Sequence, residues 1–187
     1  MRQFIDIVKQ ALMEGRDAPL YHGTHYIPAI RILEQNAIQA DTVQRIMDYL
    51  HDERGVSLSR LRNSALKFGE VLFVLDQTKL SHNFKIYPVD FFAYSAEPEN
   101  RGQGRRQGDY NEAEEFVAGS IEPLSKYLLE IQISIGAYRA ILRSRYDEHH
   151  RDHQQHWNYD ILLKHPLLKV TGSTPEMIKL WTEKLAI

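Results

Sequence analysis

The chain has 187 residues, of which 43% are hydrophobic; Lys+Arg 23 against Asp+Glu 25 gives a formal net charge of −2, and there is no cysteine. The nearly neutral charge argues against a strongly basic nucleic-acid binder, and the lack of cysteine excludes disulfide scaffolds, thiolate zinc sites and cysteine nucleophiles. The apolar runs are too short to span a bilayer and no signal-peptide block is present, so we expect a soluble, cytoplasmic, single-domain protein without membrane contact.

The sequence pattern in the first quarter of the chain predicts one short strand with helices before and after it. Residues 2–14 carry apolar side chains at helical spacing and predict an amphipathic helix, which a polar linker up to residue 18 joins to the rest. A short strand at 20–22 precedes a helix at 27–35 that ends at Asn36. Asp41 and Thr42 have the composition of an N-cap and predict a second helix to about residue 52.

The remainder of the chain predicts short strands followed by helices. Strand patterns occur at 55–59, 70–75, 83–87, 113–117 and 127–135. Helical patterns occupy 137–146 and 174–184. This order of elements favours the α+β class.

Three short segments carry residue types that are suited to chemistry. They are a Tyr-His-Gly-Thr run at 21–24, a Gly-apolar-Ser-apolar-Ser-Arg strand at 55–60 and an acidic strand at 112–117. Singly, a histidine at a strand end, a hydroxyl-bearing strand or an acidic run is more often structural than functional. Their order and spacing together indicate a functional site.

In this order the three segments resemble the ADP-ribosyltransferase superfamily, whose members cleave NAD and transfer ADP-ribose. The run His22-Gly23-Thr24 looks like the first family motif in its histidine form, 55–60 looks like the second, and Glu114-Glu115-Phe116-Val117 looks like the third. The resemblance covers roughly residues 19–135. It implies an α+β fold with a split β-sheet core and flanking helices, a single NAD-binding catalytic domain at 19–187, and NAD as substrate.

The chemistry of NAD cleavage gives each of these residue types a role. Breaking the bond between nicotinamide and ribose passes through an oxocarbenium-like state, which a nearby carboxylate stabilises. Gly23 permits close approach of a ligand amide to the backbone, and His22 can hydrogen-bond a ribose hydroxyl. Ser57 and Ser59 share one strand face, either the cleft or the solvent, and Arg60 is a candidate phosphate partner. The expected NAD-binding residues are Tyr21, His22, Gly23, Thr24, Ser57, Ser59 and Arg60.

The identity of the catalytic glutamate depends on the frame in which the third motif is aligned. A Glu-x-Glu frame, which is frequent in the family, pairs Glu112 with Glu114. Several bacterial and phage-type relatives have the catalytic Glu directly before Phe or Arg and an apolar residue, which selects Glu115. Neighbouring strand residues face opposite ways, so Glu114 and Glu115 cannot both enter one cleft. We prefer Glu115 and keep Glu114 as the alternative. The chain lacks both the first-motif Arg of arginine-modifying members and the second-motif Tyr of typical poly-ADP-ribosylating enzymes.

Two polar segments have weaker functional readings. The glycine-rich stretch at 95–111 precedes the acidic strand, where the family has a loop that recognises the target, although a plain surface loop has the same composition. The expected recognition residues for a macromolecular target, protein or nucleic acid, are Arg101, Arg105, Arg106 and Tyr110. His149 and His153 have i, i+4 spacing but no acidic base at zincin spacing, so we expect no metal site.

Two alternatives to transfer share these residues: an NAD glycohydrolase, which transfers ADP-ribose only to water, and a catalytically silent binding module on the same fold. The segment Leu12-Met13-Glu14 before Gly15 resembles the Leu-x-Glu sites at which tailed-phage head proteases trim packaged proteins, against the alternative of a chance match. That resemblance implies a phage-encoded, toxin-like effector delivered into the host cell, with residues 1–18 as a packaging tag.

Overall fold

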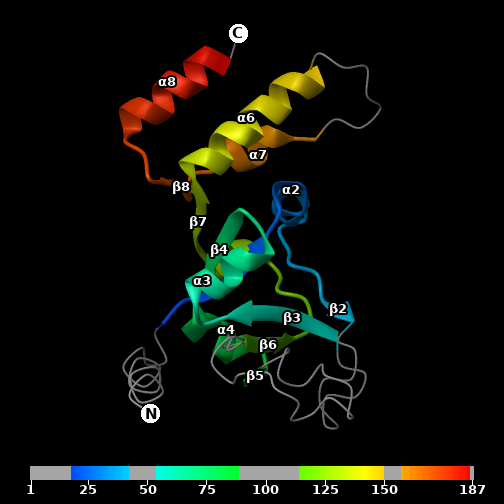
Figure 1. Cartoon of the computed structure of the whole chain (residues 1–187). Coiled ribbons are helices and arrows are strands. Elements are labelled where there is room, and N and C mark those ends of the chain that lie inside the picture. Colours follow the sequence, from blue (N-terminus) through cyan, green and yellow to red (C-terminus); the bar gives the residue numbers. More distant parts are fainter. Residues whose placement is uncertain (1–17, 43–53, 89–113, 150–156, 186–187) are drawn as a thin grey trace, which may run out of the picture.

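The computed structural model of the chain describes residues 18–42, 54–88, 114–149 and 157–185 (Figure 1). The strands are β1 Leu20–Thr24, β2 Asp41–Thr42, β3 Arg54–Ser59, β4 Val71–Leu75, β5 Ile86–Pro88, β6 Glu114–Ala118, β7 Leu128–Ser134 and β8 Leu168–Thr171. The helices are α2 Tyr26–Gln35, α3 Arg62–Ala65, η1 Leu66–Phe68, α4 Gln77–Asn83, η3 Leu124–Lys126, α6 Ile135–His149, α7 Tyr159–Leu163 and α8 Pro175–Leu185. Strands and helices mix along the chain, which confirms the predicted α+β class.

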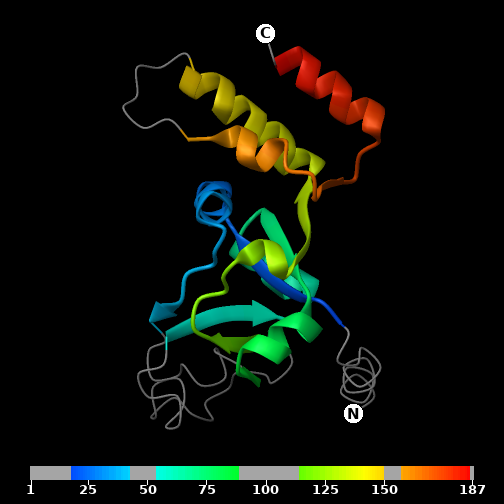
Figure 2. The ribbon, with the colours of Figure 1, turned by 180° about the vertical axis from the view of Figure 1, so that it is seen from behind.

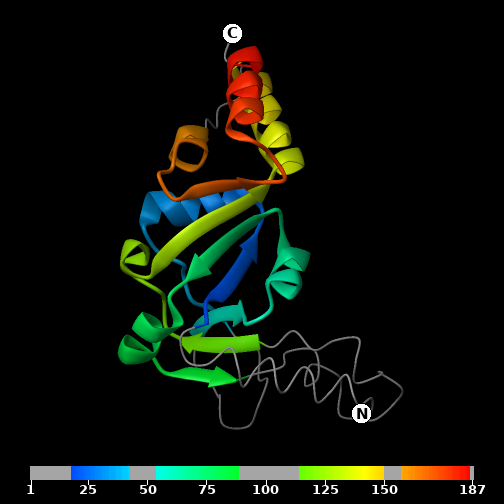
Figure 3. The same ribbon diagram turned by 90° about the vertical axis from the view of Figure 1, so that its left-hand side faces the viewer.

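The described strands form one mixed sheet that consists of two halves. Its order is β5-β6-β3-β1-β4-β7-β8, with β2 beside β3, and β7 and β8 are its parallel pair. β1 pairs with β4 along its whole length but with β3 at a single register position, Tyr21↔Ser59. In Figures 1 and 3, β3 and β6 run across the direction of β4 and β7. The two halves therefore part from each other between β1 and β3.

The hydrophobic core lies around β4, whose five residues are all buried. This burial explains the uninterrupted apolar run at 71–75, because a central strand covered on both faces has no solvent-facing side. Helix α2 covers the core beside α7, while α6, α7 and α8 gather at the β7–β8 end (Figure 2). Among the described helices, none has the length and apolar character needed to cross a bilayer.

Most of the predicted elements are confirmed where the structure describes them. The strands expected at 20–22, 55–59, 70–75 and 127–135 and the helices expected at 27–35, 137–146 and 174–184 are present, with ends that differ by at most three residues. Asn36 ends α2 in the left-handed conformation (φ 50°), and its N–H donates to carbonyls of the last turn. The segment 113–117 corresponds to β6, which begins at Glu114.

Asp41 and Thr42, which were expected at the start of a helix, form β2 because they pair antiparallel with Gly55 and Arg54. One prediction at an element end was wrong. The strand expected at 83–87 begins only at Ile86, because α4 extends to Asn83 and Phe84 stands between the two elements as its C-cap. Helices 2–14 and 43–52, the loop 95–111 and the Leu-x-Glu segment lie outside the described residues.

Candidate functional site

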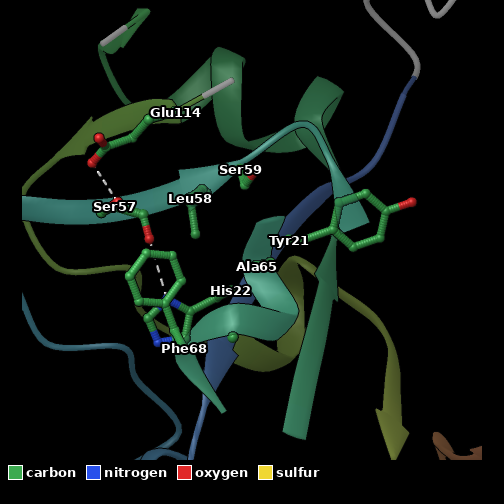
Figure 4. Close-up of a pocket in the computed structure, with 9 residues that line it drawn as sticks. Tyr21, His22, Ser57, Leu58, Ser59, Ala65, Phe68 and Glu114 are labelled. Atoms are coloured by element: carbon green, nitrogen blue, oxygen red, sulfur yellow. Dashed lines mark hydrogen bonds between the residues drawn. The ribbon is translucent and has the colours of Figure 1, made fainter. Parts of the chain in front are cut away.

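A pocket of about 150 Å³ opens where β1, β3 and β6 meet the turn formed by α3 and η1 (Figure 4). A cavity of that volume accommodates one benzene-sized ring. It is lined by Tyr21, His22, Gly23, Ser57, Leu58, Ser59, Ala65, Phe68 and Glu114. All three segments singled out from the sequence therefore contribute side chains or backbone to one cavity.

Gly23 allows α3 to lie directly on β1. A Cβ added at this position would stand 1.7 Å from the carbonyl oxygen of Ala65, so no larger residue fits without displacement of backbone. The close approach therefore holds α3 and η1, which carry Ala65 and Phe68, against the strand that carries the first motif. A glycine at this position is thus required by packing.

The register of β1 and β3 also directs the backbone of Gly23 toward the pocket. The His22 ring reaches the Ser57 carbonyl, so that carbonyl points toward β1, and Ser59, two residues on, points the same way. Tyr21 pairs with Ser59, and Gly23 follows Tyr21 by two residues, so the N–H and C=O of Gly23 face the gap where β1 and β3 part. A backbone N–H and C=O that face the same gap can bind a carboxamide, because the N–H donates to the amide oxygen and the C=O accepts from the amide N–H.

His22 is held in one tautomer by its backbone partner. Its Nδ1 lies 3.2 Å from the carbonyl oxygen of Ser57, and because a carbonyl only accepts, Nδ1 carries the hydrogen. The ring packs against Phe73, with the two ring centroids 6.4 Å apart. Burial lowers the pKa of His22 below its ordinary value, against the opposing effect of the hydrogen bond to Ser57. The ring is therefore neutral near pH 7, and its Nε2 is a hydrogen-bond acceptor.

Ser57 connects His22 to Glu114. The Ser57 hydroxyl donates to Glu114 Oε1, while the Ser57 carbonyl accepts from the His22 ring, so one residue fixes both groups (Figure 4). Glu114 is 5% exposed and lines the pocket. The second hydroxyl of the strand, that of Ser59, binds the N–H and C=O of Leu61 at 3.0 and 3.1 Å and so helps to shape the turn before α3.

Glu115 lies on the opposite face of β6. Its register partner is Leu58, a core residue, and its Oε1 forms an ion pair with Arg60 Nε at 2.9 Å. Burial raises the pKa of Glu115 above its ordinary value, although the charge of Arg60 acts in the other direction. Neither Glu115 nor Arg60 lines the pocket. The geometry thus favours Glu114 as the pocket carboxylate, in place of the Glu115 that we preferred from the sequence, and it pairs Arg60 with Glu115 outside the pocket lining.

The remaining candidate residues differ in whether they line the pocket. Tyr21 lines the pocket, whereas Thr24 stands at the end of β1 and does not. Phe68, which the sequence analysis missed, lines the pocket from η1 and is 48% exposed. The candidate recognition residues Arg101, Arg105, Arg106 and Tyr110 lie outside the described residues, as does His153. Within the described ranges, no three His, Asp or Glu side chains cluster in a way that would hold a metal ion.

No family model, curated protein or solved structure matches the chain. The interpretation of the pocket therefore depends on its own residues and on the motifs that form it.

Proposed function

We propose that the chain is an ADP-ribosyltransferase, which transfers ADP-ribose from NAD to a macromolecular target and releases nicotinamide. The observation that carries the proposal is the linked unit in which Ser57 binds both the His22 ring and Glu114 at a pocket of single-ring size. The three-motif resemblance in the sequence and the parting of the sheet between β1 and β3 support the same conclusion.

The nicotinamide end of NAD fits the lining of the pocket. The aromatic side chain of Phe68 offers a face on which the pyridinium ring can stack, and half of that side chain is available to a ligand. The backbone of Gly23 supplies an N–H and a C=O for the carboxamide. Ring and amide together fix the glycosidic bond relative to the polar wall formed by Ser57 and Glu114.

The polar wall then supplies the groups that the reaction needs. His22 Nε2 accepts a hydrogen bond from a hydroxyl of the nicotinamide ribose, which orients the sugar. As the C–N glycosidic bond breaks, its electron pair leaves with neutral nicotinamide and positive charge develops on the ribose. The Glu114 carboxylate, oriented by the Ser57 hydroxyl, stabilises that charge. A nucleophile of the target then bonds to the ribose carbon and loses its proton.

The proposal is tested by incubating the protein and cell extract with NAD labelled in its adenylate half. Nicotinamide should be released, and label should appear on protein or nucleic acid. Ser57→Ala should lower the rate by at least about tenfold, because the carboxylate loses its oriented partner. Ser81→Ala is the matched control, since the Ser81 hydroxyl also donates one hydrogen bond, to Thr78 O at 2.9 Å, but lies on α4 away from the pocket.

The outcomes separate the three readings of the site. Nicotinamide release matched by free ADP-ribose, without labelled macromolecule, would indicate a glycohydrolase. Absence of both NAD binding and NAD cleavage would contradict the enzyme class. NAD binding without cleavage would indicate a silent module.

A further inference from the structure

A second pair of titratable side chains lies just beyond the pocket, at the junction of β1 and α2. His25 Nδ1 stands 2.8 Å from Glu70 Oε2, and Glu70 Oε1 accepts the N–H of Tyr26 at 2.9 Å. One carboxylate thus binds the histidine ring and caps the first turn of α2, where His25 itself makes no side-chain cap. The cap accounts for the contact between Glu70 and Tyr26, but it gives no structural role to the exposed ring of His25, which the same carboxylate holds in place.

This pair borders the pocket through the segment that follows η1. A Cβ added to Gly69 would stand 2.2 Å from Thr24 O and 2.5 Å from His25 N, so Gly69 is packed against the end of β1. Its neighbour Phe68 lines the pocket. The register that pairs Thr24 with Val71, continued by one residue, brings His25 opposite Glu70 on the sheet face that also carries Gly23.

The pair has a defined hydrogen-bonding character. Because the carboxylate only accepts, Nδ1 of His25 donates to it, and in the tautomer that this contact selects Nε2 is left as an acceptor. The His25 side chain is 73% exposed, so this acceptor is open to a ligand. Burial tends to raise the pKa of Glu70, but the hydrogen bonds from His25 and Tyr26 outweigh it and the pKa lies below its ordinary value. An acceptor nitrogen backed by an ionised carboxylate attracts hydroxyl groups and repels phosphates.

The pocket has room for one ring, so the adenosine half of NAD must lie outside it. We propose that the His25–Glu70 pair binds the ribose hydroxyls of that adenosine half and selects NAD over NADP, whose 2′-hydroxyl carries a phosphate. This inference rests on the proposed function. It assigns the pair a specificity role on the substrate, outside the bond-breaking step.

The test is calorimetric binding of ADP-ribose and of 2′-phospho-ADP-ribose, neither of which has a nicotinamide bond to break. Wild type should bind ADP-ribose at least about tenfold more tightly. His25→Ala should reduce that ratio to about threefold or less. Glu70→Gln should do the same while keeping the cap on Tyr26, because the glutamine oxygen can accept the N–H and its amide then donates to His25 Nδ1. That reversal puts the hydrogen on Nε2 and turns the acceptor into a donor.

His82→Ala is the control, since the ring of His82 is likewise exposed and bonded through Nδ1, to Thr78 O at 2.8 Å, but lies on α4. It should leave the ratio unchanged. A wild type without preference, or variants that keep the preference, would overturn the role of His25 and Glu70, while transfer of label from NAD to a macromolecule would still uphold the transferase. Slower transfer with an unchanged ratio would also overturn it, in favour of a role at the acceptor. A wild type that binds neither compound and does not cleave NAD would overturn both proposals.

Discussion

Replacing Gly23 by alanine changes the packing of the pocket without removing any of its polar groups. The new Cβ would lie 1.7 Å from Ala65 O and 2.6 Å from Ala65 C, both backbone atoms, so no side-chain rotation can relieve the overlap. Overpacking of this kind costs about 3 kcal/mol at the upper end of its usual range. For a chain of this size we expect a melting temperature lower by about 6–12 °C.

Gly136→Ala is the matched control, because the nearest atom to its added Cβ is Ser134 Oγ at 3.8 Å and the position lies in α6. Alanine there should stabilise the protein by up to about 1 kcal/mol. Calorimetric melting of both variants, with nicotinamide release measured beside it, checks the reasoning. In Gly23→Ala the release should fall as well, because α3 must move and takes Phe68 with it. A melting temperature at or above that of wild type would refute the packing of α3 on β1.

Three further outcomes follow from individual contacts. Burial lowers the pKa of His22, so kcat/KM for NAD should fall at acid pH, where the ring becomes protonated, with a midpoint below 6.5. Because the unfolded chain binds this proton more readily, thermal melts should also show that stability declines as the pH drops below about 6.5. Phe68→Ala should raise KM for NAD by about tenfold with little change in melting temperature, whereas Leu167→Ala, exposed away from the pocket, should leave KM unchanged. Asn36→Ala should cost about 2 kcal/mol in urea unfolding, since it adds left-handed strain and loses the bond to Ser125 N–H, and Asn36→Gly about half of that.

The parts of the fold that the sequence predicts are those with a local signature. The apolar run at 71–75 and the alternation at 127–135 identify β4 and β7 without knowledge of their neighbours. Asp41 and Thr42 have cap-like composition, yet pairing with β3, a contact distant in sequence, makes them a strand. β8 depends on β7 in the same way, because its four residues are too few for a period to show.

The site follows the same division. The His-Gly pair and the Ser-x-Ser strand identify two walls of the pocket from sequence alone. No polarity pattern distinguishes Glu114 from Glu115, because the first four residues of β6 are all buried. Only the register with β3 puts Glu114 opposite Ser59 and Glu115 opposite Leu58. Phe68 was missed because a single aromatic residue in a three-residue turn has no periodicity from which its exposure follows.

The most direct test of the proposed transferase compares the initial rate of nicotinamide release from NAD by Glu114→Gln and Glu115→Gln at equal concentrations of folded protein. Glu114→Gln should lose at least about 100-fold in rate while keeping a melting temperature close to that of wild type. Glu115→Gln should keep its rate within about threefold but melt at a lower temperature, because Arg60 loses its buried carboxylate partner. A Glu114→Gln variant that releases nicotinamide at the wild-type rate, or a Glu115→Gln variant that is folded and inactive, would contradict the assignment of the pocket.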